Sequence, residues 1–263
     1  MGIIYAVVTN KGGVGKTSFI SNLAAAMVKK LPKARVLLVD TDPKGNLAIA
    51  FGKSPAQLKH TIYNALTEEV PIQDVKIPLI ERLDLIPANQ RMASLTFDAS
   101  PDPLYLLKSS LEEIRDPYDF IFIDTPSAIG MLMWNVLGAA DRIMIPIEPE
   151  TFAVAAMVQM ADVIQDFQKK HRPELIIDGI VAMKVDDITA LYSEMLPLAR
   201  KYCHSKGLHM YDTVIPKSMQ YANSVAYERR PAFLSTPKHR FIAPYGEMVR
   251  EVLAHAAEKT TVS

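Results

Sequence analysis

Short, almost uniformly apolar runs alternate along this chain with longer stretches of helical periodicity, and this alternation limits the possible folds more than any other feature. The apolar runs are rich in β-branched residues and cover residues 3–8, 35–39, 83–86, 120–123, 142–147, 176–182 and 210–215. The helical stretches cover residues 16–30, 103–114, 130–139, 152–171, 190–205 and 244–257. Apolar strands separated by helices predict an α/β fold, with a mainly parallel, twisted sheet and helices on both faces.

The whole chain, residues 1–263, is expected to form a single domain. Hydrophobic residues make up 49% and charged residues 22% of the sequence, which is typical of a globular protein with a sizeable core. No stretch rich in glycine and serine, in proline or in like charges separates the two halves, so we expect no linker.

Charge and cysteine content exclude several classes of protein. Lysine plus arginine equals aspartate plus glutamate at 29 each, so any contact with DNA must come from a local patch. The single cysteine, Cys203, excludes a disulfide framework or a cysteine-rich metal site within one chain, and a reducing cytoplasm fits best. We expect neither an export signal nor a membrane span, because the sequence enters a predicted strand at once and has no run of about 18 apolar residues.

Residues 10–18, NKGGVGKTS, follow the first predicted strand and open the first predicted helix. Glycines let successive backbone N–H groups turn toward one point, and the helix N-terminus adds a partial positive charge. Lys16 would supply charge for the β- and γ-phosphates of a nucleotide, and Thr17 a hydroxyl for Mg²⁺. A glycine-rich turn with solvated lysines is the alternative, which the flanking strand and helix disfavour. The predicted nucleotide-binding residues of this loop are Lys11, Gly12, Gly13, Val14, Gly15, Lys16, Thr17 and Ser18.

The extra lysine of this loop, Lys11, gives the segment a recognisable form. The standard motif GxxxxGK[ST] has a glycine where Asn10 stands, whereas KGGVGKT resembles the KGGxGK[ST] motif of the deviant Walker ATPases related to ParA and MinD. This resemblance to a group of P-loop NTPases implies that Lys11 contacts the nucleotide of a partner subunit in an ATP-sandwich dimer, and that Lys16 is the P-loop lysine. It covers nearly the whole chain and is weakest at residues 53–82. We expect no helix-turn-helix domain before the loop, as in the short ParA subtype.

Two acidic residues stand where the second predicted strand ends, in the sequence VDTDPKGN. Asp40 and Asp42 are two residues apart, so both side chains point the same way if the backbone stays extended. The segment resembles the family's DxDPQGN switch I, which implies that Asp42 is the catalytic carboxylate that places the attacking water and that Asp40 supports the metal. Lys44 replaces the usual glutamine. The alternative is an Asp-Pro turn followed by a helix cap at Asn46.

A third aspartate, Asp124, follows the apolar run FIFI. This is the Walker B arrangement, in which the carboxylate holds Mg²⁺ through a water while the metal offsets phosphate charge. A simple strand end is the alternative for this residue alone. The following residues, 126–141, resemble the family's switch II. The predicted metal site is therefore Thr17, Asp40 and Asp124, and the predicted catalytic residues are Lys11, Lys16 and Asp42. No strong general base is evident, which predicts slow turnover that a partner accelerates.

Two segments of the C-terminal half resemble the same family. Residues 145–153 match its P-x-x-P-E-x-F-A segment, and residues 213–218 resemble its IPRS segment beside the adenine. Ile215 and Pro216 could therefore pack on the base, although loop and core roles are equally open.

Related ParA proteins bind DNA without sequence preference through basic residues in the C-terminal half. Such contacts reach phosphates, depend on salt and read no sequence. Scattered surface charge is the alternative for each residue. The candidates here are Arg200, Lys201, Lys217, Arg229, Arg230, Lys238, His239 and Arg240.

The resemblance implies an ATPase that uses ATP and Mg²⁺, forms a homodimer, binds DNA non-specifically in the ATP state and drives plasmid or chromosome partition. Its expected partner is a centromere-binding, ParB-like adaptor, and its expected location the nucleoid of a bacterium or archaeon. Alternatives are an ATPase that positions a protein cargo, a MinD-like surface ATPase, a metal-cluster carrier and a scaffold that holds ATP without hydrolysing it. The single Cys203 disfavours the cluster carrier, and the weakly apolar residues 254–263 disfavour membrane binding.

Overall fold

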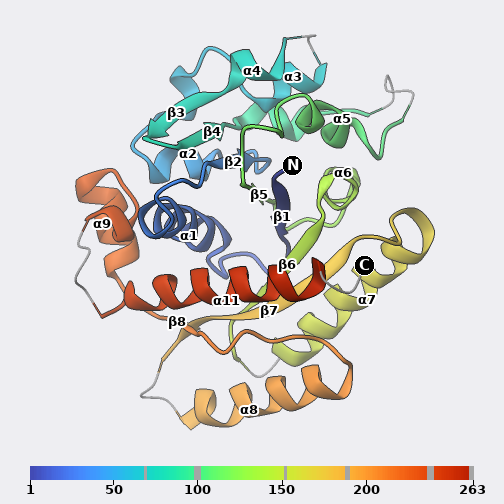
Figure 1. The fold of residues 1–263 in the computed structure, drawn as a ribbon, viewed down its shortest axis with the longest axis vertical. Helices are drawn as coiled ribbons and strands as arrows, with labels where there is room; N and C mark the ends of the chain where they lie inside the picture. Colours follow the sequence, from blue (N-terminus) through green and yellow to red (C-terminus); the bar gives the residue numbers. More distant parts are fainter. Residues whose placement is uncertain (68–69, 98–101, 151–152, 187–189, 236–239, 261–263) are drawn as a thin grey trace.

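The strands of this protein form one sheet in the computed structural model (Figure 1). The structure describes all residues except 68–69, 98–101, 151–152, 187–189, 236–239 and 261–263. The strands of the described part are β1 (Ile3–Val7), β2 (Val36–Asp40), β3 (Ile77–Ile80), β4 (Leu83–Ile86), β5 (Phe120–Asp124), β6 (Arg142–Ile147), β7 (Ile176–Val185) and β8 (Ile215–Pro216). Their order across the sheet is β3-β4-β2-β5-β1-β6-β7-β8.

Neighbouring strands run parallel, except that β3 and β4 form an antiparallel pair at one edge. The predicted mainly parallel α/β fold is therefore confirmed. In the register of the central strands, Val7 lies beside Asp124, and Asp40 lies on the other side of the same aspartate. The carboxyl ends of β1, β2 and β5 therefore meet at one point of the sheet edge.

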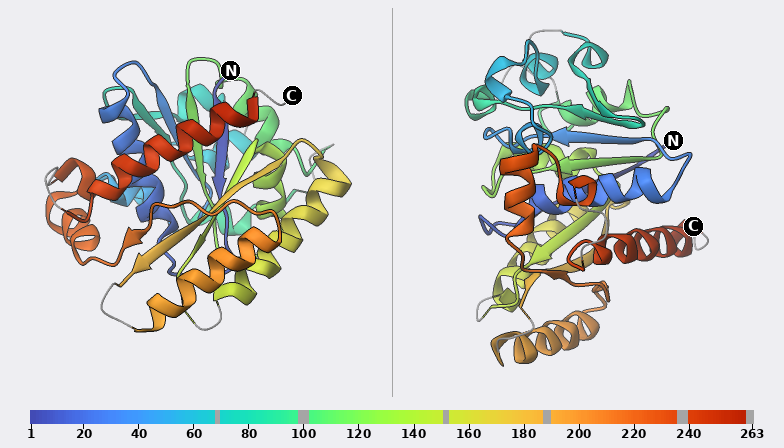
Figure 2. Two further views of the ribbon diagram at one scale, coloured as in Figure 1. Left: turned by 60° about the horizontal axis from the view of Figure 1, so that its bottom comes forward. Right: turned by 90° about the vertical axis from the view of Figure 1, so that its left-hand side faces the viewer.

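Helices cover both faces of this sheet (Figures 1 and 2). They are α1 (Lys16–Lys30), α2 (Asn46–Ala50), α3 (Ile62–Thr67), α4 (Ile72–Val75), α5 (Leu106–Glu112), α6 (Met131–Ala139), α7 (Ala153–His171), α8 (Ala190–Ser205), α9 (Gln220–Glu228), α10 (Ala232–Ser235) and α11 (Ala243–Thr260). The longer helices follow the prediction closely. The short helices α2, α3, α4 and α10 were not predicted, because four to six residues carry too little helical periodicity, and α9 was not predicted either.

The side chains of strand β1 contribute alternately to two buried apolar clusters, one on each face of the sheet. Ile4 and Ala6 belong to a buried cluster that includes residues of α5, α6 and α7, whereas Tyr5 and Val7 belong to a second cluster with residues of α1 and α11. Successive side chains of a strand point to opposite faces, so a strand covered on both sides must be apolar at every position. This is why the predicted strands lack polar alternation.

The predicted strand at residues 210–215 is wrong for most of its length. Met210 makes only an isolated bridge with Ile180, and β8 begins at Ile215. In between, the backbone N–H groups of Asp212 and Thr213 donate hydrogen bonds to the Glu251 carboxylate of α11, at 2.8 and 2.9 Å. These donors are satisfied by a side chain instead of a neighbouring strand.

The chain order of the strands produces a crevice beside β1. From β1 the chain passes to β2 on one side of the sheet, and only later reaches β6 on the other side. Loops that leave such a point in opposite directions open a gap at the carboxyl ends of the strands, where open α/β sheets bind ligands. The glycine-rich segment follows β1 directly and lies at this gap.

A buried ion pair joins the neighbouring strands β6 and β7 and gives a test of the packing there. Arg142 donates to Asp178 at 2.6 Å, with side chains 7% and 0% exposed, and Tyr211 donates its hydroxyl to the same carboxylate. Asp178→Ala leaves a buried guanidinium unpaired, so we expect the free energy of unfolding to fall by about 3–5 kcal/mol in urea denaturation. The exposed control Asp116→Ala should change it by less than about 0.5 kcal/mol. A loss below about 1 kcal/mol for Asp178→Ala would contradict this role.

Candidate functional site

The glycine-rich loop ends where α1 begins. Gly15 has the left-handed backbone angle φ 100°, which favours glycine, and it precedes the first residue of α1. No described side chain caps this helix N-terminus, so its first N–H groups point out of the loop with a partial positive charge. The next residue, Lys16, is only 7% exposed. This backbone geometry suits an anion such as a phosphate.

A cavity of about 890 Å³ opens over this loop. The predicted site residues that line it are Gly13, Val14, Gly15, Lys16, Thr17, Ser18, Asp42, Ile215 and Pro216, together with Lys217, which was predicted to bind DNA. Lys11, Gly12, Asp40 and Asp124 do not line it. Lining residues for which no binding role was predicted include Lys44, Asn46, Ser127, Met183, Lys184, Met219 and Tyr221. The structure thus brings segments that follow β1, β2, β5 and β7 into one place.

The polar end of the cavity is built on two hydrogen bonds. The Thr17 hydroxyl donates to Oδ2 of Asp124 at 2.5 Å, and the Lys16 ammonium donates to the Ser127 hydroxyl at 3.2 Å. Asp124 is 1% exposed, and its other oxygen, Oδ1, accepts no hydrogen bond from the described residues. A buried carboxylate oxygen without a partner is costly, and water on a divalent cation would satisfy it. The donor set of Thr17 and Asp124 therefore fits Mg²⁺.

Burial shifts the pKa values of both charged groups at this end. Burial raises the pKa of Asp124 to about 6, although the hydrogen bond from Thr17 and the charge of Lys16 oppose the shift. Burial lowers the pKa of Lys16, while the charges of Asp124 and Asp42 act in the opposite direction. Perturbed pKa values of this kind are common at functional sites. Burial thus disfavours the charged form of each side chain. A bound cation would stabilise the Asp124 carboxylate, and a bound phosphate would stabilise the Lys16 ammonium.

Asp40 is the last residue of β2. It is fully buried, and its two carboxylate oxygens accept the backbone N–H groups of Asp42 and Leu47, at 2.9 and 3.0 Å. Burial and the charge of Asp124 raise its pKa well above the usual range. The side chain thus fixes the loop that carries Asp42 and does not line the cavity. Its predicted place in the metal shell stays a prediction.

Asp42 lies at the edge of the cavity. Its Oδ1 accepts the backbone N–H of Lys44 at 3.0 Å, which holds the carboxylate in an Asx-type turn. Lys44, at the position of the family's glutamine, is exposed and also lines the cavity. The predicted catalytic carboxylate therefore has access to the cavity, and its role in placing water stays a prediction.

Lys11 is held by acidic residues of its own chain. Its ammonium lies 2.5 Å from Glu150 and 3.9 Å from Glu148, and Lys184 lies 3.4 Å from the same Glu148 oxygen. The hydrogen bond from Lys11 lowers the pKa of Glu150. The sequence matched this segment to the family but assigned no role to either glutamate. Their position just after β6, at the same sheet edge as the loop, was the available signal.

Apolar side chains also line the cavity. Ile215 and Pro216 of β8 line it together with Met183, Tyr221 and Val225. Flat apolar surfaces beside a phosphate site suit a nucleotide base. The strained backbone of Lys184, with φ 55°, is next to Met183, and both side chains approach Gly15. The sequence analysis did not single out Lys184, because the predicted strand at residues 176–182 ends before it, whereas β7 extends to Val185.

The basic residues predicted to bind DNA are spread over several elements. Arg200 and Lys201 lie on α8, and Arg200 forms an ion pair with Asp212 at 3.0 Å. Arg229 and Arg230 follow α9, which Figure 1 places well away from α8. The other candidates are Lys217, which is exposed, Arg240, which precedes α11, and Lys238 and His239, which lie outside the described residues.

Comparison with known proteins decides the family. The AAA domain family AAA_31 matches residues 2–177. The sporulation initiation inhibitor protein Soj of Bacillus subtilis is 32% identical, over 97% of this chain and 100% of Soj. The chain belongs to the ParA-type superfamily. The resemblance that the sequence motifs indicated is thereby confirmed.

Other relatives of this ParA-type protein match over nearly their whole length. The chromosome partitioning protein ParA of Caulobacter vibrioides is 29% identical, over 97% of this chain and 96% of that protein. A crystal structure of cobyrinic acid a,c-diamide synthase from Mycobacterium smegmatis, with bound ATP analogue and magnesium, aligns with a TM-score of 0.84. It is 26% identical and covers 97% of this chain and 95% of its own. These relatives share a P-loop ATPase architecture.

None of the described helices is long and apolar enough to cross a membrane. Nor does the described part of the chain contain a group of three or more histidine, cysteine, aspartate or glutamate residues arranged to hold a metal ion.

The buried charge of Asp124 gives a test that needs no nucleotide. An unfolded aspartate ionises near pH 4 and this folded one at about 6, so ionisation lowers the free energy of unfolding as pH rises through that interval. At pH 8 in EDTA, we expect Asp124→Asn to raise the free energy of unfolding by on the order of 2 kcal/mol. Thermal and urea denaturation would measure it, with Asp42→Asn, at a half-buried carboxylate, as the matched control. A clear loss of stability in Asp124→Asn would contradict a raised pKa of Asp124 in the folded protein.

Proposed function

We propose that this ParA-type protein is an ATPase that dimerises around ATP·Mg²⁺, binds DNA non-specifically in that state and drives plasmid or chromosome partition. The observation that carries the proposal is the pairing of Thr17 with the partly unsatisfied Asp124 beneath the Lys16 loop. Together these residues offer one site for a metal and one for phosphates, at the switch point of the sheet. The cobyrinic acid synthase of the same architecture has an ATP analogue and magnesium in its crystal structure.

The residues of the loop would divide the work of binding the nucleotide. Lys16 and the N–H groups at the start of α1 would hold the phosphates, while Thr17 and Asp124 would hold Mg²⁺. The metal would supply charge that stabilises the phosphates during transfer to water. Ile215 and Pro216 would pack on the base.

Hydrolysis would depend on positioning more than on base strength. Asp42 has access to the cavity and would orient the attacking water, but no group of the cavity described above is an evident strong base. We therefore propose slow turnover by the protein alone. A ParB-like adaptor bound to the cargo would accelerate it by completing the geometry of the site.

Dimerisation would use Lys11. In this structure its ammonium is neutralised by Glu150 and Glu148, so contact with a second subunit's nucleotide requires an exchange of one set of anions for another. Phosphate carries more charge than a single carboxylate and can compete for the lysine, because the Glu150 side chain, its nearer partner, is 46% exposed. The ParA protein of Caulobacter vibrioides, named for chromosome partitioning, supports partition as the use of this cycle. Positioning of a protein cargo is the second candidate, since the same cycle would serve it.

The first test separates the roles of three residues by ATP hydrolysis and light scattering. Lys16→Ala should abolish detectable nucleotide binding, because it removes a buried charge from the phosphate site. Lys11→Ala should bind ATP as a monomer but fail to dimerise, and Asp42→Ala should dimerise while hydrolysing ATP at least about tenfold more slowly. Lys33→Ala, at an exposed lysine remote from the loop in sequence, is the control. ATP-dependent dimers of Lys11→Ala would contradict the proposed sandwich.

The second test concerns DNA. We expect the protein to retard arbitrary duplex DNA with ATP and Mg²⁺ but much less with ADP, because only the dimer presents two copies of its basic residues together. Retardation should weaken steeply with salt and be independent of sequence. Lys201→Ala, at an exposed lysine with no structural role, should weaken it without altering ATP hydrolysis. Equal retardation in ATP and ADP would contradict the proposed nucleotide switch, and no retardation with either nucleotide would argue for a cargo other than DNA.

A further inference from the structure

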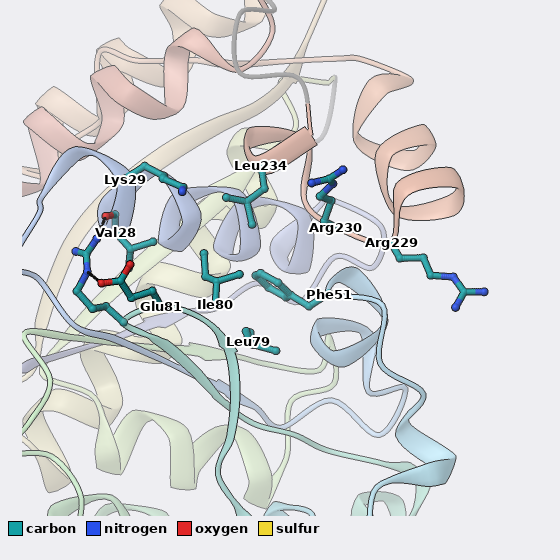
Figure 3. A pocket seen from close by; sticks show the side chains of 10 residues that line it. Val28, Lys29, Phe51, Leu79, Ile80, Glu81, Arg229, Arg230 and Leu234 are labelled. Atoms are coloured by element: carbon teal, nitrogen blue, oxygen red, sulfur yellow. Dashed lines mark hydrogen bonds and ion pairs between the residues drawn. The ribbon is translucent and has the colours of Figure 1, made fainter.

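A second pocket, separate from the nucleotide cavity, combines an apolar floor with a basic rim. Its volume is about 350 Å³, and it lies between the end of α1, the β3–β4 turn and the connection from α9 to α10. Figure 3 shows Phe51, Ile80 and Leu234 close together in this pocket, with Arg230 beside them and the Arg229 side chain extending outward from the edge. From these features we propose that the pocket is a docking site for an acidic amphipathic helix of a partner protein, coupled to the nucleotide state.

The floor of the pocket offers apolar surface to an incoming side chain. Phe51, Leu79, Ile80 and Leu234 are half-buried and come from three separate parts of the chain. A volume of this size admits a few side chains, and so suits one or two apolar anchors of a partner. Duplex DNA contacts proteins mainly through its charged backbone and would leave such a floor uncovered. The floor therefore favours a protein partner over DNA.

The rim is positively charged, although the chain as a whole has a net charge of zero. Lys29 and Arg229 are exposed and form no ion pair within the described residues, and Arg230 has only an exposed pair with Glu228 at 3.5 Å. Glu81 is the one acidic residue among those that line the pocket. Three cations against one acid predict that the partner carries acidic residues beside its apolar anchor.

The remaining basic residue of the pocket, Arg82, is already used within the fold. Its guanidinium donates to the backbone carbonyls of Val28 and Leu31, both at 2.9 Å, and to that of Ala34 at 3.3 Å. These bonds satisfy carbonyls at the end of α1. Arg82 therefore forms part of the wall and is not available to a partner.

The two walls of the pocket are fixed against each other by a close backbone approach. Gly52 follows Phe51 directly, and a Cβ added at Gly52 would lie 2.7 Å from the Cβ and 2.8 Å from the carbonyl oxygen of Arg229. Gly52 also has φ 71° and Arg229 has φ 54°, both in the left-handed region. A backbone conformation that is unfavourable for arginine thus sets the position of the rim.

Both walls continue into the nucleotide cavity. Phe51 ends α2, whose residues Ile49 and Ala50 line that cavity, and Arg229 ends α9, whose residues Ala222 and Val225 line it as well. A movement of α2 or α9 on nucleotide binding would change the distance between the pocket walls. A partner that prefers one wall spacing must then change nucleotide affinity in return, because coupling between two sites is reciprocal.

The position of the pocket favours a helix over an added strand. β3 is the edge strand of the described sheet, and it has only four residues, of which Pro78 has no N–H group to donate. An extended peptide would find few backbone partners there. A helix binds through side chains at i, i+3 and i+4, so it can place apolar anchors in the pocket and acidic residues on the rim.

The test uses a display library of random 16-residue peptides, selected on the full-length protein. We expect enriched peptides to carry aspartate or glutamate around apolar residues at helical spacing. In fluorescence anisotropy, Arg229→Glu and Arg230→Glu should each weaken their binding at least about tenfold, whereas Lys53→Glu, an exposed lysine outside the pocket, should change it less than about twofold. A peptide with lysine in place of its acidic residues should bind Arg230→Glu better than it binds the unaltered protein.

Several results would overturn the proposal. One is the absence of acidic, apolar peptides after selection, and another is equal binding by the charge-reversed variants. Loss of DNA retardation in both arginine variants, without any selective peptide, would assign the arginines to DNA instead. Equal peptide affinity with ATP, with ADP and without nucleotide would refute the coupling. Peptide binding can be measured without nucleotide, so failure of the proposed ATPase cycle would be seen separately.

Discussion

The burial of two opposite charges beneath one loop is the constraint on which the rest of this structure depends. Lys16 and Asp124 are both nearly inaccessible to water, and each loses solvation that their mutual attraction only partly replaces. Asp124 keeps one carboxylate oxygen without a partner, and the helix N-terminus above it keeps uncapped N–H groups. A fold that tolerates this arrangement stabilises itself further when phosphate and metal bind, because they supply the missing partners.

The strand order explains how the necessary residues reach that point. β1, β5 and β2 end side by side, so the loop, Asp124 and the Asp40–Asp42 turn meet there without any long connection. Asp40 is buried behind this turn and holds its backbone, which leaves Asp42 at the cavity. Helix α2 follows this turn, and α9 follows β8. The residues directly after these two helices contribute to the walls of the second pocket. The same short segments therefore connect the chemistry of the loop with a distant surface.

Much of this could be predicted from the sequence, for identifiable physical reasons. The long helices and central strands follow the hydrophobic period, and Lys16, Thr17 and Asp124 stand directly at strand or helix ends. α3 and α4 were missed because each is too short to show a helical period. The stretch 210–215 was misread because the backbone N–H groups of Asp212 and Thr213 donate to Glu251 of a remote helix. Partners of long side chains were also hidden: Ser127, Lys184 and the glutamates around Lys11 come together only through the fold. Sequence spacing indicates which backbone loops meet, but it does not indicate which groups the ammonium of a long lysine side chain contacts.

The central claim is that Lys11 exchanges Glu150 for the nucleotide of a second copy of this chain. A crystal structure with a non-hydrolysable ATP analogue and magnesium measures this directly, through the distances from the Lys11 ammonium to Glu150 and to the phosphates. The account predicts two copies face to face, with Lys11 of each on the phosphates of the other and metal beside Thr17 and Asp124. A single copy that holds the nucleotide while Lys11 still contacts Glu150, or a cavity without nucleotide at saturating concentration, would contradict it.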